Sequence, residues 1–486
     1  MASTDADLAQ TVTLDPGRLP CLPRRLSPLE RGLRLFTEVR GGEGVTAVVM
    51  FANVFLILCS YYCLKPLRDG WIAVSALQGL SSVEVKAYTS FAQSLVMIGA
   101  VALYARLVTR WPRRELITRT TLFCMSNLLL FWLLRHQHVA EAGIAFYIWV
   151  GLFGLFVVSQ FWAFAADLYT DERGRRLMPM IAIGATAGAV TGSLIASTIV
   201  QSGVLDSGAL LLAANIPLLG AIALTGVADA RGPLGEGQPS AEPRRPAVPI
   251  VAPGSPHVGV LNLVSHNRYL LTVAAVTLLS HWVSTNGDNL LFRTVQEALA
   301  KQLATRRSLD AHAMNIFLRE GTTAFYGSYF FWINVCALVL QAFVASRLLK
   351  YGGFGVILLL LPVIALLGYS AMAFLPLLLV IRVMKTAESS TGYSINNTAQ
   401  QVLWLPTTTE MKYKAKPAIE TCVVRLGDGL AAVTVLIGVH FYALSTRSLF
   451  MFNVVLVVLW LGLGVLVVRE HQRIRVRAGV SPAGSG

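Results

Sequence analysis

The chain has 486 residues, of which 55% are hydrophobic and only 14% are charged, and its mean hydropathy is +0.61. A soluble globular protein carries about 25% charged residues, because its surface must be hydrated. The apolar residues here form runs of about 20, the length that crosses a hydrocarbon core. This composition excludes a soluble enzyme and a free binder of nucleic-acid polymers. The net charge of +14 therefore indicates first how the spans are oriented in the membrane.

Twelve apolar spans are predicted in chain order. The first six cover residues 45–67, 88–108, 116–135, 142–166, 178–202 and 207–228. The second six cover residues 269–292, 324–346, 354–372, 374–396, 418–442 and 447–468. The predicted domains are an N-terminal segment (1–44), two six-helix bundles (45–228 and 269–468), a Pro- and Gly-rich linker between them (229–268) and a tail (469–486). Residues 293–323 form a long loop in this scheme.

Basic residues predict the orientation of these spans. Most of the 40 lysines and arginines fall in segments on one side, namely both termini, the linker and the loops after even-numbered spans. Because basic loops stay in the cytoplasm, both termini are predicted to be cytoplasmic in a multi-pass protein of the inner membrane. The lipid bilayer is thus an expected partner, and a monomer is compatible with this layout.

The two halves repeat weakly in sequence. TDERGRR after span four parallels TEMKYKA after span ten, which aligns Asp171 with Glu410 and Arg173 with Lys412. An even number of spans in each repeat implies parallel duplication about an axis along the membrane normal. That arrangement is typical of major-facilitator transporters, whose binding site lies near the midplane between the halves. The predicted fold class is therefore an all-α, major-facilitator-like membrane protein. We expect Asp171, Arg173, Glu410, Lys412 and Lys414, together with Asp167 at the end of span four, to act as gating residues.

Several charged residues lie inside the predicted spans or directly at their ends. Each costs roughly 2.5–3.5 kcal/mol on insertion scales unless it has a partner or a water-filled cavity. These residues are Lys65, Arg68 and Asp69 in span one, Asp288 in span seven, Arg382, Lys385 and Glu388 in span ten, and Arg425 and Asp428 in span eleven. The spacing of three in Lys385–Glu388 and in Arg425–Asp428 places each pair on one helix face.

Two interpretations of these charges stay open. In the first, they only hold helices together as ion pairs. In the second, the excess of cations lines a cavity for a small anionic substrate. We predict substrate binding by Lys65, Arg68, Lys385 and Arg425, with Asp69, Asp288, Glu388 and Asp428 as ion-pair or coupling partners.

Proline, glycine and cysteine give weaker signals. Pro66 interrupts a helix interior, either as a tolerated kink or to free backbone groups for a ligand. Gly184, Gly188 and Gly192 recur every four residues, which favours close helix packing, with a hinge as the alternative. The six cysteines are scattered and have no metal-ligand spacing, so we expect no metal site. No catalytic constellation or cofactor motif occurs, so we expect neither an enzyme nor a cofactor.

Three segments carry a family resemblance. They are SYYCLKPLRDG (60–70), FWAFAADLYTDERGRRLMPMIAIGATAGA (161–189) and NNTAQQVLWLPTTTEMKYKAKPAIETCVVRLGDGLAA (396–432). Together they resemble the ATP/ADP translocases of intracellular bacteria and plastids, and more closely the free-living bacterial branch of that nucleotide-transporter family. The resemblance covers roughly residues 45–470. It implies a twelve-helix carrier that exchanges or imports nucleotides, with Lys65, Arg68 and Asp69 in the basic-acidic element that ends the first helix.

Three functions compete on this evidence. The leading one is a secondary transporter of a nucleotide or a similar phosphorylated anion, working by alternating access. The second is a proton-coupled carrier of another small solute, in which an intramembrane carboxylate carries the proton. The third is a membrane enzyme or assembly factor, which no sequence feature favours.

Overall fold

The computed structural model describes residues 40–477 except 41, 76–78, 109, 135–139, 170, 232–256, 306–309, 405, 409 and 410. The described residues are helical and contain no strand. Nearly all of the predicted N-terminal segment, most of the linker and residues 478–486 of the tail thus lie outside the described residues.

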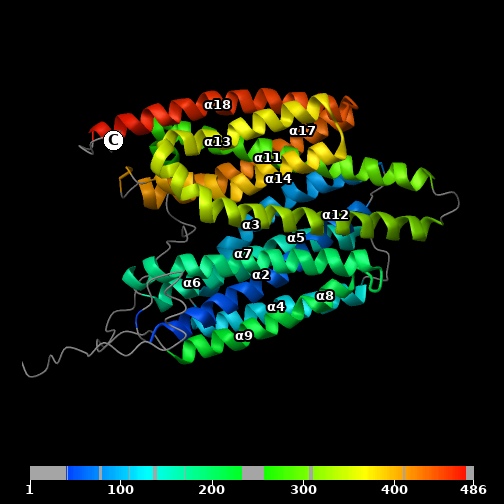
Figure 1. The fold of residues 1–486 in the computed structure, drawn as a ribbon, viewed down its shortest axis with the longest axis horizontal. Coiled ribbons are helices and arrows are strands. Elements are labelled where there is room, and N and C mark those ends of the chain that lie inside the picture. The colour runs from blue at the N-terminus through cyan, green and yellow to red at the C-terminus, as the bar shows by residue number, and fades with distance from the viewer. Residues whose placement is uncertain are drawn as a thin grey trace, which may run out of the picture.

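The described helices form twelve long rods besides one short helix (Figure 1). Several helices are joined end to end by π-helical turns (η). The N-terminal half contains α2 (Gly44–Ala73), α3 (Ser82–Val108), α4 (Arg113–Leu134), α5–η1–α6 (Ala140–Phe153, Gly154–Val158, Ser159–Leu168), α7 (Asp171–Ser202) and α8–α9 (Ala209–Ala213, Asn215–Ala230). The C-terminal half contains α10 (His257–His266), α11 (Arg268–Thr305), α12–η2 (Ala311–Val339, Leu340–Ala345), α13 (Ser346–Phe374), α14–η3–α15 (Leu378–Thr391, Gly392–Asn396, Asn397–Leu403), η4–α16–η5–α17–η6 (Met411–Ala415, Lys416–Ala418, Ile419–Val423, Val424–Val435, Leu436–Phe441) and α18 (Thr446–Arg477). Short α10 precedes the six rods of this half. A kink at the non-helical Gly353 separates the rod of α12 from the main part of α13.

Nine helical segments in the described part of the chain are long and apolar enough to cross a membrane. The three rods outside this group are α3, α11 and α14–η3–α15. They carry many of the polar side chains described below, and these lower the hydropathy of the rod. The all-α membrane fold expected from the sequence is confirmed.

The prediction of a long loop between spans seven and eight is wrong. Helix α11 continues to Thr305 and α12 begins at Ala311, so the two helices extend past the others as a pair (Figure 1). Hydropathy detects only the part of a helix that matches the apolar thickness of a membrane. It therefore missed the polar helical turns that continue beyond that thickness.

The glycines of α7 pack directly against α2. A Cβ atom at Gly184 would lie 2.8 Å from the carbonyl oxygen of Phe51, and Cβ atoms at Gly188 and Gly192 would collide with the carbonyl oxygens of Phe55 and Cys59. Both rows advance by four residues, so the two helix backbones stay in register along their contact. The structure thus supports the packing interpretation of this stripe.

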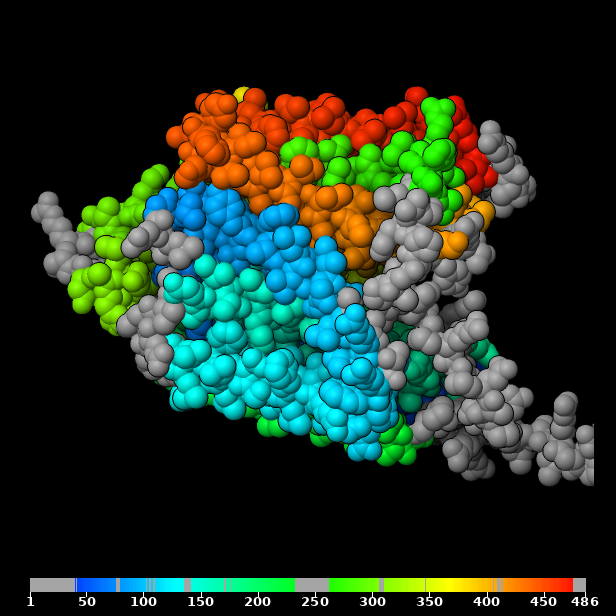
Figure 2. All heavy atoms as spheres, turned by 180° about the vertical axis from the view of Figure 1, so that it is seen from behind, coloured from blue at the N-terminus to red at the C-terminus, as the bar shows by residue number. Residues whose placement is uncertain are grey.

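The two halves meet closely at one end, here called the closed end, where α2 ends and α3 begins. Ser207 donates its hydroxyl hydrogen to Glu320 Oε1 over 2.7 Å. His440 Nδ1 lies 2.9 Å from Glu84 Oε1. A Cβ atom at Gly327 of α12 would lie 2.9 Å from the backbone nitrogen of Ser197 in α7. Toward the opposite end, the space-filling view shows a hollow between the orange segment of the C-terminal half and the teal-green segment of the N-terminal half (Figure 2).

Candidate functional site

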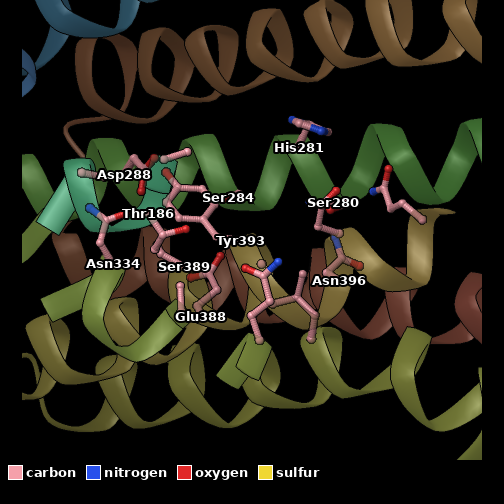
Figure 3. Close-up of a pocket in the computed structure, with 18 of the residues that line it drawn as sticks. Thr186, Ser280, His281, Ser284, Asp288, Asn334, Glu388, Ser389, Tyr393 and Asn396 are labelled. Atoms are coloured by element: carbon pink, nitrogen blue, oxygen red, sulfur yellow. The ribbon is translucent and has the colours of Figure 1, made fainter. Parts of the chain in front are cut away.

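Two adjoining cavities lie between the halves. The large cavity, of about 500 Å³, is lined from α2, α7, α11, α12, α14 and η3, among other elements. The small cavity, of about 210 Å³, lies nearer the closed end and is lined from α2, α3, α11 and α12, among others. Asp288, Ser389 and Tyr393 line both, so the two cavities share a wall. Figure 3 shows Asp288, Ser284, Glu388 and Ser389 together in the large cavity, with Asn396 and Ser280 farther along it.

Lys65 lines the small cavity without an acidic partner. Its ammonium nitrogen lies 4.2 Å from the ring centroid of Phe330 and 5.1 Å from that of Tyr62. It also donates a long hydrogen bond of 3.5 Å to the Tyr393 hydroxyl. Within the described part of the chain, no carboxylate oxygen lies within 4.0 Å of this nitrogen. Aromatic faces stabilise a cation, but they do not neutralise its charge.

Asp69 is the acid of a three-member cluster in the same cavity. Its carboxylate lies 3.0 Å from Lys86 Nζ and 3.5 Å from Arg68 Nη2. The Arg68 guanidinium also lies 4.3 Å from the ring centroid of Tyr147. One buried carboxylate therefore serves two cations, and the long Arg68 contact leaves that guanidinium only partly satisfied.

Lys385 is buried completely in an ion-pair cluster. Its ammonium nitrogen lies 3.1 Å from Asp288 Oδ1 and 2.9 Å from Glu388 Oε2. The Tyr369 hydroxyl donates a hydrogen bond of 2.9 Å to Glu388. The Lys385 side chain is 0% exposed, whereas that of Asp288 is 56% exposed and faces the cavities. The spacing of three in Lys385–Glu388 thus forms the expected pair, and Asp288 joins it from α11.

Asp428 binds Arg425 and bridges the two halves. Arg425 Nη1 lies 3.0 Å from Asp428 Oδ2. The same carboxylate accepts hydrogen bonds from Thr285 over 2.8 Å and from Ser94 over 3.2 Å. Because Ser94 lies on α3 and Asp428 on α17, this contact connects the N-terminal and C-terminal halves.

The structure places only two of the four cations that were predicted to bind substrate at a cavity. Lys65 and Arg68 line the small cavity, but Lys385 and Arg425 line neither cavity. Both of these side chains form ion pairs with carboxylates instead. A sequence shows that a cation lies at membrane depth, but the tertiary packing decides whether its charge meets a carboxylate or open space.

Two of the predicted gating residues, Asp167 and Arg173, make contacts within one half. Asp167 forms an ion pair with Arg113, and Arg173 Nε lies 3.1 Å from Glu43 Oε1. Lys414 is exposed. Glu410 and the side chains of Asp171 and Lys412 lie outside the described residues.

Sequence reasoning missed Lys86 and the amides of the large cavity. Because span two was predicted to begin at residue 88, Lys86 was assigned to a loop, whereas α3 begins at Ser82. The acid Glu84 and the base Lys86 at the start of α3 resemble a solvated helix end, so no local signal distinguishes them. The amides Gln341, Asn396, Asn397 and Gln400 line the large cavity. They were not predicted because only charged residues at membrane depth stand out in the sequence, and amides are neutral.

No protein-family model and no curated protein matches the sequence. Solved structures do match the fold. An autoinhibited peptide transporter of the POT family is 11% identical with a TM-score of 0.59, covering 87% of this chain and 97% of its own. The nucleoside transporter NupG is 11% identical with a TM-score of 0.58, covering 88% and 98%. A bacterial homologue of the human lysosomal transporter Spinster, in an inward-facing and unoccupied conformation, is 12% identical with a TM-score of 0.55, covering 87% and 98%.

The chain has a major-facilitator-like fold. At such low identity the likeness concerns the fold alone, and it agrees with the parallel duplication expected from the sequence.

Proposed function

We propose that this protein is a secondary active transporter that carries a phosphorylated anion of the nucleotide type by alternating access. The observation that carries the proposal is the environment of Lys65, a cation that lines a cavity between the halves and has no carboxylate partner among the described residues. A cation at membrane depth is costly unless something compensates its charge. A bound anion would convert this cost into affinity.

The chemistry of the small cavity supports a phosphate group as that anion. Arg68 presents a planar guanidinium, which suits bidentate contact with phosphate oxygens, whereas Lys65 and Lys86 act as point charges. The tyrosine hydroxyls of Tyr326 and Tyr393 also line this cavity and can donate hydrogen bonds. The resemblance to ATP/ADP translocases adds nucleotides as the phosphorylated class.

The contacts at the closed end support alternating access as the mechanism. To expose the site on the other side, the contacts Ser207–Glu320 and Glu84–His440 must break while the opposite end closes. If basic loops are cytoplasmic, the closed end faces outward and the hollow faces the cytoplasm. We propose that Asp171, Arg173, Glu410, Lys412 and Lys414 form cross-half contacts in the opposite state, and that Arg173 leaves Glu43 then.

Transport by reconstituted protein tests this proposal. Liposomes are loaded with unlabelled ATP, ADP or phosphate, and uptake of labelled ATP is measured with and without a proton gradient. We expect uptake that depends on internal nucleotide or phosphate, because an empty carrier with an uncompensated Lys65 reorients slowly. Lys65→Gln should reduce uptake roughly tenfold or more, the loss of one charge-assisted hydrogen bond. If no phosphorylated anion is carried under any loading, the proposal fails.

One observation favours a proton-coupled carrier as the second candidate. Asp288 lines both cavities with a half-exposed carboxylate and also pairs with buried Lys385. Intramembrane carboxylates placed in this way are the usual proton carriers. In the same liposomes, this candidate predicts that another small solute is taken up with no internal substrate and that the proton gradient drives this uptake. Asp288→Asn should abolish the dependence on the gradient.

A further inference from the structure

The two cavities differ in chemistry although they share a wall. Every charged side chain that lines the large cavity, Asp288 and Glu388, lies at its boundary with the small one or in the Lys385 cluster. The rest of its polar lining is neutral and includes Gln341, Asn396, Asn397 and Gln400. In the described part of the chain these four amides make no side-chain hydrogen bond to other protein groups. Each amide offers both donors and acceptors, so together they can bind a neutral polar group.

The large cavity also carries aromatic faces. Tyr62 and Trp460 line it, and Tyr393 lies where it meets the small cavity. Amide groups pair with the edges of nucleobases, and aromatic side chains stack on the faces of bases. The lining therefore fits a nucleoside better than it fits a second phosphate.

The charge of the small cavity is nearly balanced. Its lining side chains and the full ion-pair clusters that they belong to comprise five cations and four carboxylates. The cations are Lys65, Arg68, Lys86, Lys385 and Arg425, and the carboxylates are Asp69, Asp288, Glu388 and Asp428. The excess is a single positive charge, which corresponds to Lys65. A phosphomonoester carries about −1.5 to −2 charges at pH 7, which already offsets this single positive charge, and every further phosphate adds only uncompensated negative charge.

Two buried donors in the small cavity also lack acceptors. Arg68 Nε and Asn289 Nδ2 are buried and donate no hydrogen bond to any group in the described part of the chain. Both residues line the small cavity, and Asn289 is only 3% exposed. A buried donor without an acceptor is destabilising. The oxygens of one phosphate group would satisfy both.

We propose that the two cavities form one bipartite site for a nucleoside monophosphate. Its phosphate lies in the small cavity among Lys65, Arg68 and Asn289, and its nucleoside lies in the large cavity against the amides. This inference rests on the proposed function and narrows it, because it assigns the substrate one phosphate rather than two or three.

Binding to the purified full-length protein tests this assignment. The probes are AMP, GMP, CMP and UMP, their triphosphates, the parent nucleosides and inorganic phosphate. Affinity is measured by calorimetry and by the shift in unfolding temperature. We expect at least one monophosphate to bind about tenfold or more tightly than both its nucleoside and its triphosphate, because the nucleoside leaves the small cavity empty and the triphosphate adds more negative charge than the monophosphate.

Two variants separate the two parts of the site. Asn396→Ala should weaken binding of the monophosphate several-fold and leave binding of inorganic phosphate unchanged. Lys65→Gln should weaken both. Lys301→Gln, an exposed residue near the end of α11, is the matched control for charge and should change neither.

The outcomes distinguish this inference from the proposed function. If a triphosphate binds as tightly as its monophosphate or more tightly, or if Asn396→Ala changes no affinity, the bipartite monophosphate site is wrong while a nucleotide transporter remains. If neither inorganic phosphate nor any phosphorylated compound binds, both proposals are wrong.

Discussion

Lys65 and Lys385 are both lysines at membrane depth, but their surroundings are opposite. Lys65 contacts aromatic rings and a hydroxyl and borders a cavity. Lys385 is fully buried between two carboxylates, Asp288 and Glu388. Removing one partner of a buried ion pair leaves an uncompensated charge, whereas removing an unpaired cation leaves none. The two residues should therefore respond differently to the same substitution.

We expect Lys385→Gln to destabilise the protein by roughly 3–5 kcal/mol, because it strands two carboxylates. Lys65→Gln should lose transport with little change in stability. Unfolding temperature in detergent and uptake per folded molecule, measured for each variant, check both statements. If Lys385 bound substrate, as predicted from the sequence alone, its replacement would instead reduce transport and leave folding nearly intact.

The double variant Lys385→Gln/Glu388→Gln is the control, because it removes one charge of each sign and should recover part of the stability. Equal unfolding temperatures for Lys385→Gln and the unsubstituted protein would show that the cluster is not a stabilising ion pair.

At the scale of helices, the contact between α2 and α7 depends on the absence of side chains. The glycines Gly184, Gly188 and Gly192 allow the two backbones to approach closely, because a Cβ atom at any of them would clash with a backbone carbonyl oxygen of α2. These helices carry site residues as well, since Lys65 lies on α2 and Thr186 on α7. A separation of the helices would thus move the walls of both cavities.

We expect Gly188→Ala to destabilise the protein by about 1–3 kcal/mol, because the new methyl group meets the Phe55 carbonyl oxygen and the helices must move apart. Gly99→Ala on α3 is the matched control, since its Cβ meets no atom within 4 Å. That change should be neutral or stabilise by up to about 1 kcal/mol through helix propensity. Thermal unfolding of the two variants measures the difference; equal effects would refute a tight contact at Gly188.

At the scale of the whole molecule, transport requires the closed end to open. The contact between Ser207 and Glu320 connects the N-terminal half to α12, and the contact between Glu84 and His440 connects α3 to η6. Since both contacts lie on the same side of the cavities, they must separate together when the site is exposed there.

A covalent link across this end should stop transport. We expect the double variant Ser207→Cys/Glu320→Cys, treated with a short reducible thiol cross-linker, to lose uptake and to regain it on reduction. Each single-cysteine variant receives the same treatment as a control for the native cysteines, of which Cys422 is exposed. Full uptake by the cross-linked protein would exclude an opening at this end.

Local properties of the sequence determined the all-α membrane fold, the approximate positions of the helices and the pairs Lys385–Glu388 and Arg425–Asp428. These features could be predicted because they depend only on residues that are close in the chain, as hydropathy and helical periodicity do. The parallel duplication also followed from the sequence, because it depends on the number of spans rather than on their contacts.

Only the tertiary structure decided which charges are neutralised. Lys86 reaches Asp69 from another helix, Asp288 reaches Lys385 from α11, and Lys65 alone of these cations lines a cavity with no acid beside it. The π-helical turn η3, which carries Tyr393 and Asn396 to the cavity wall, also had no signal in the sequence. These features depend on how distant helices pack against each other, and the energy of a buried charge depends on the groups that this packing brings within a few ångströms.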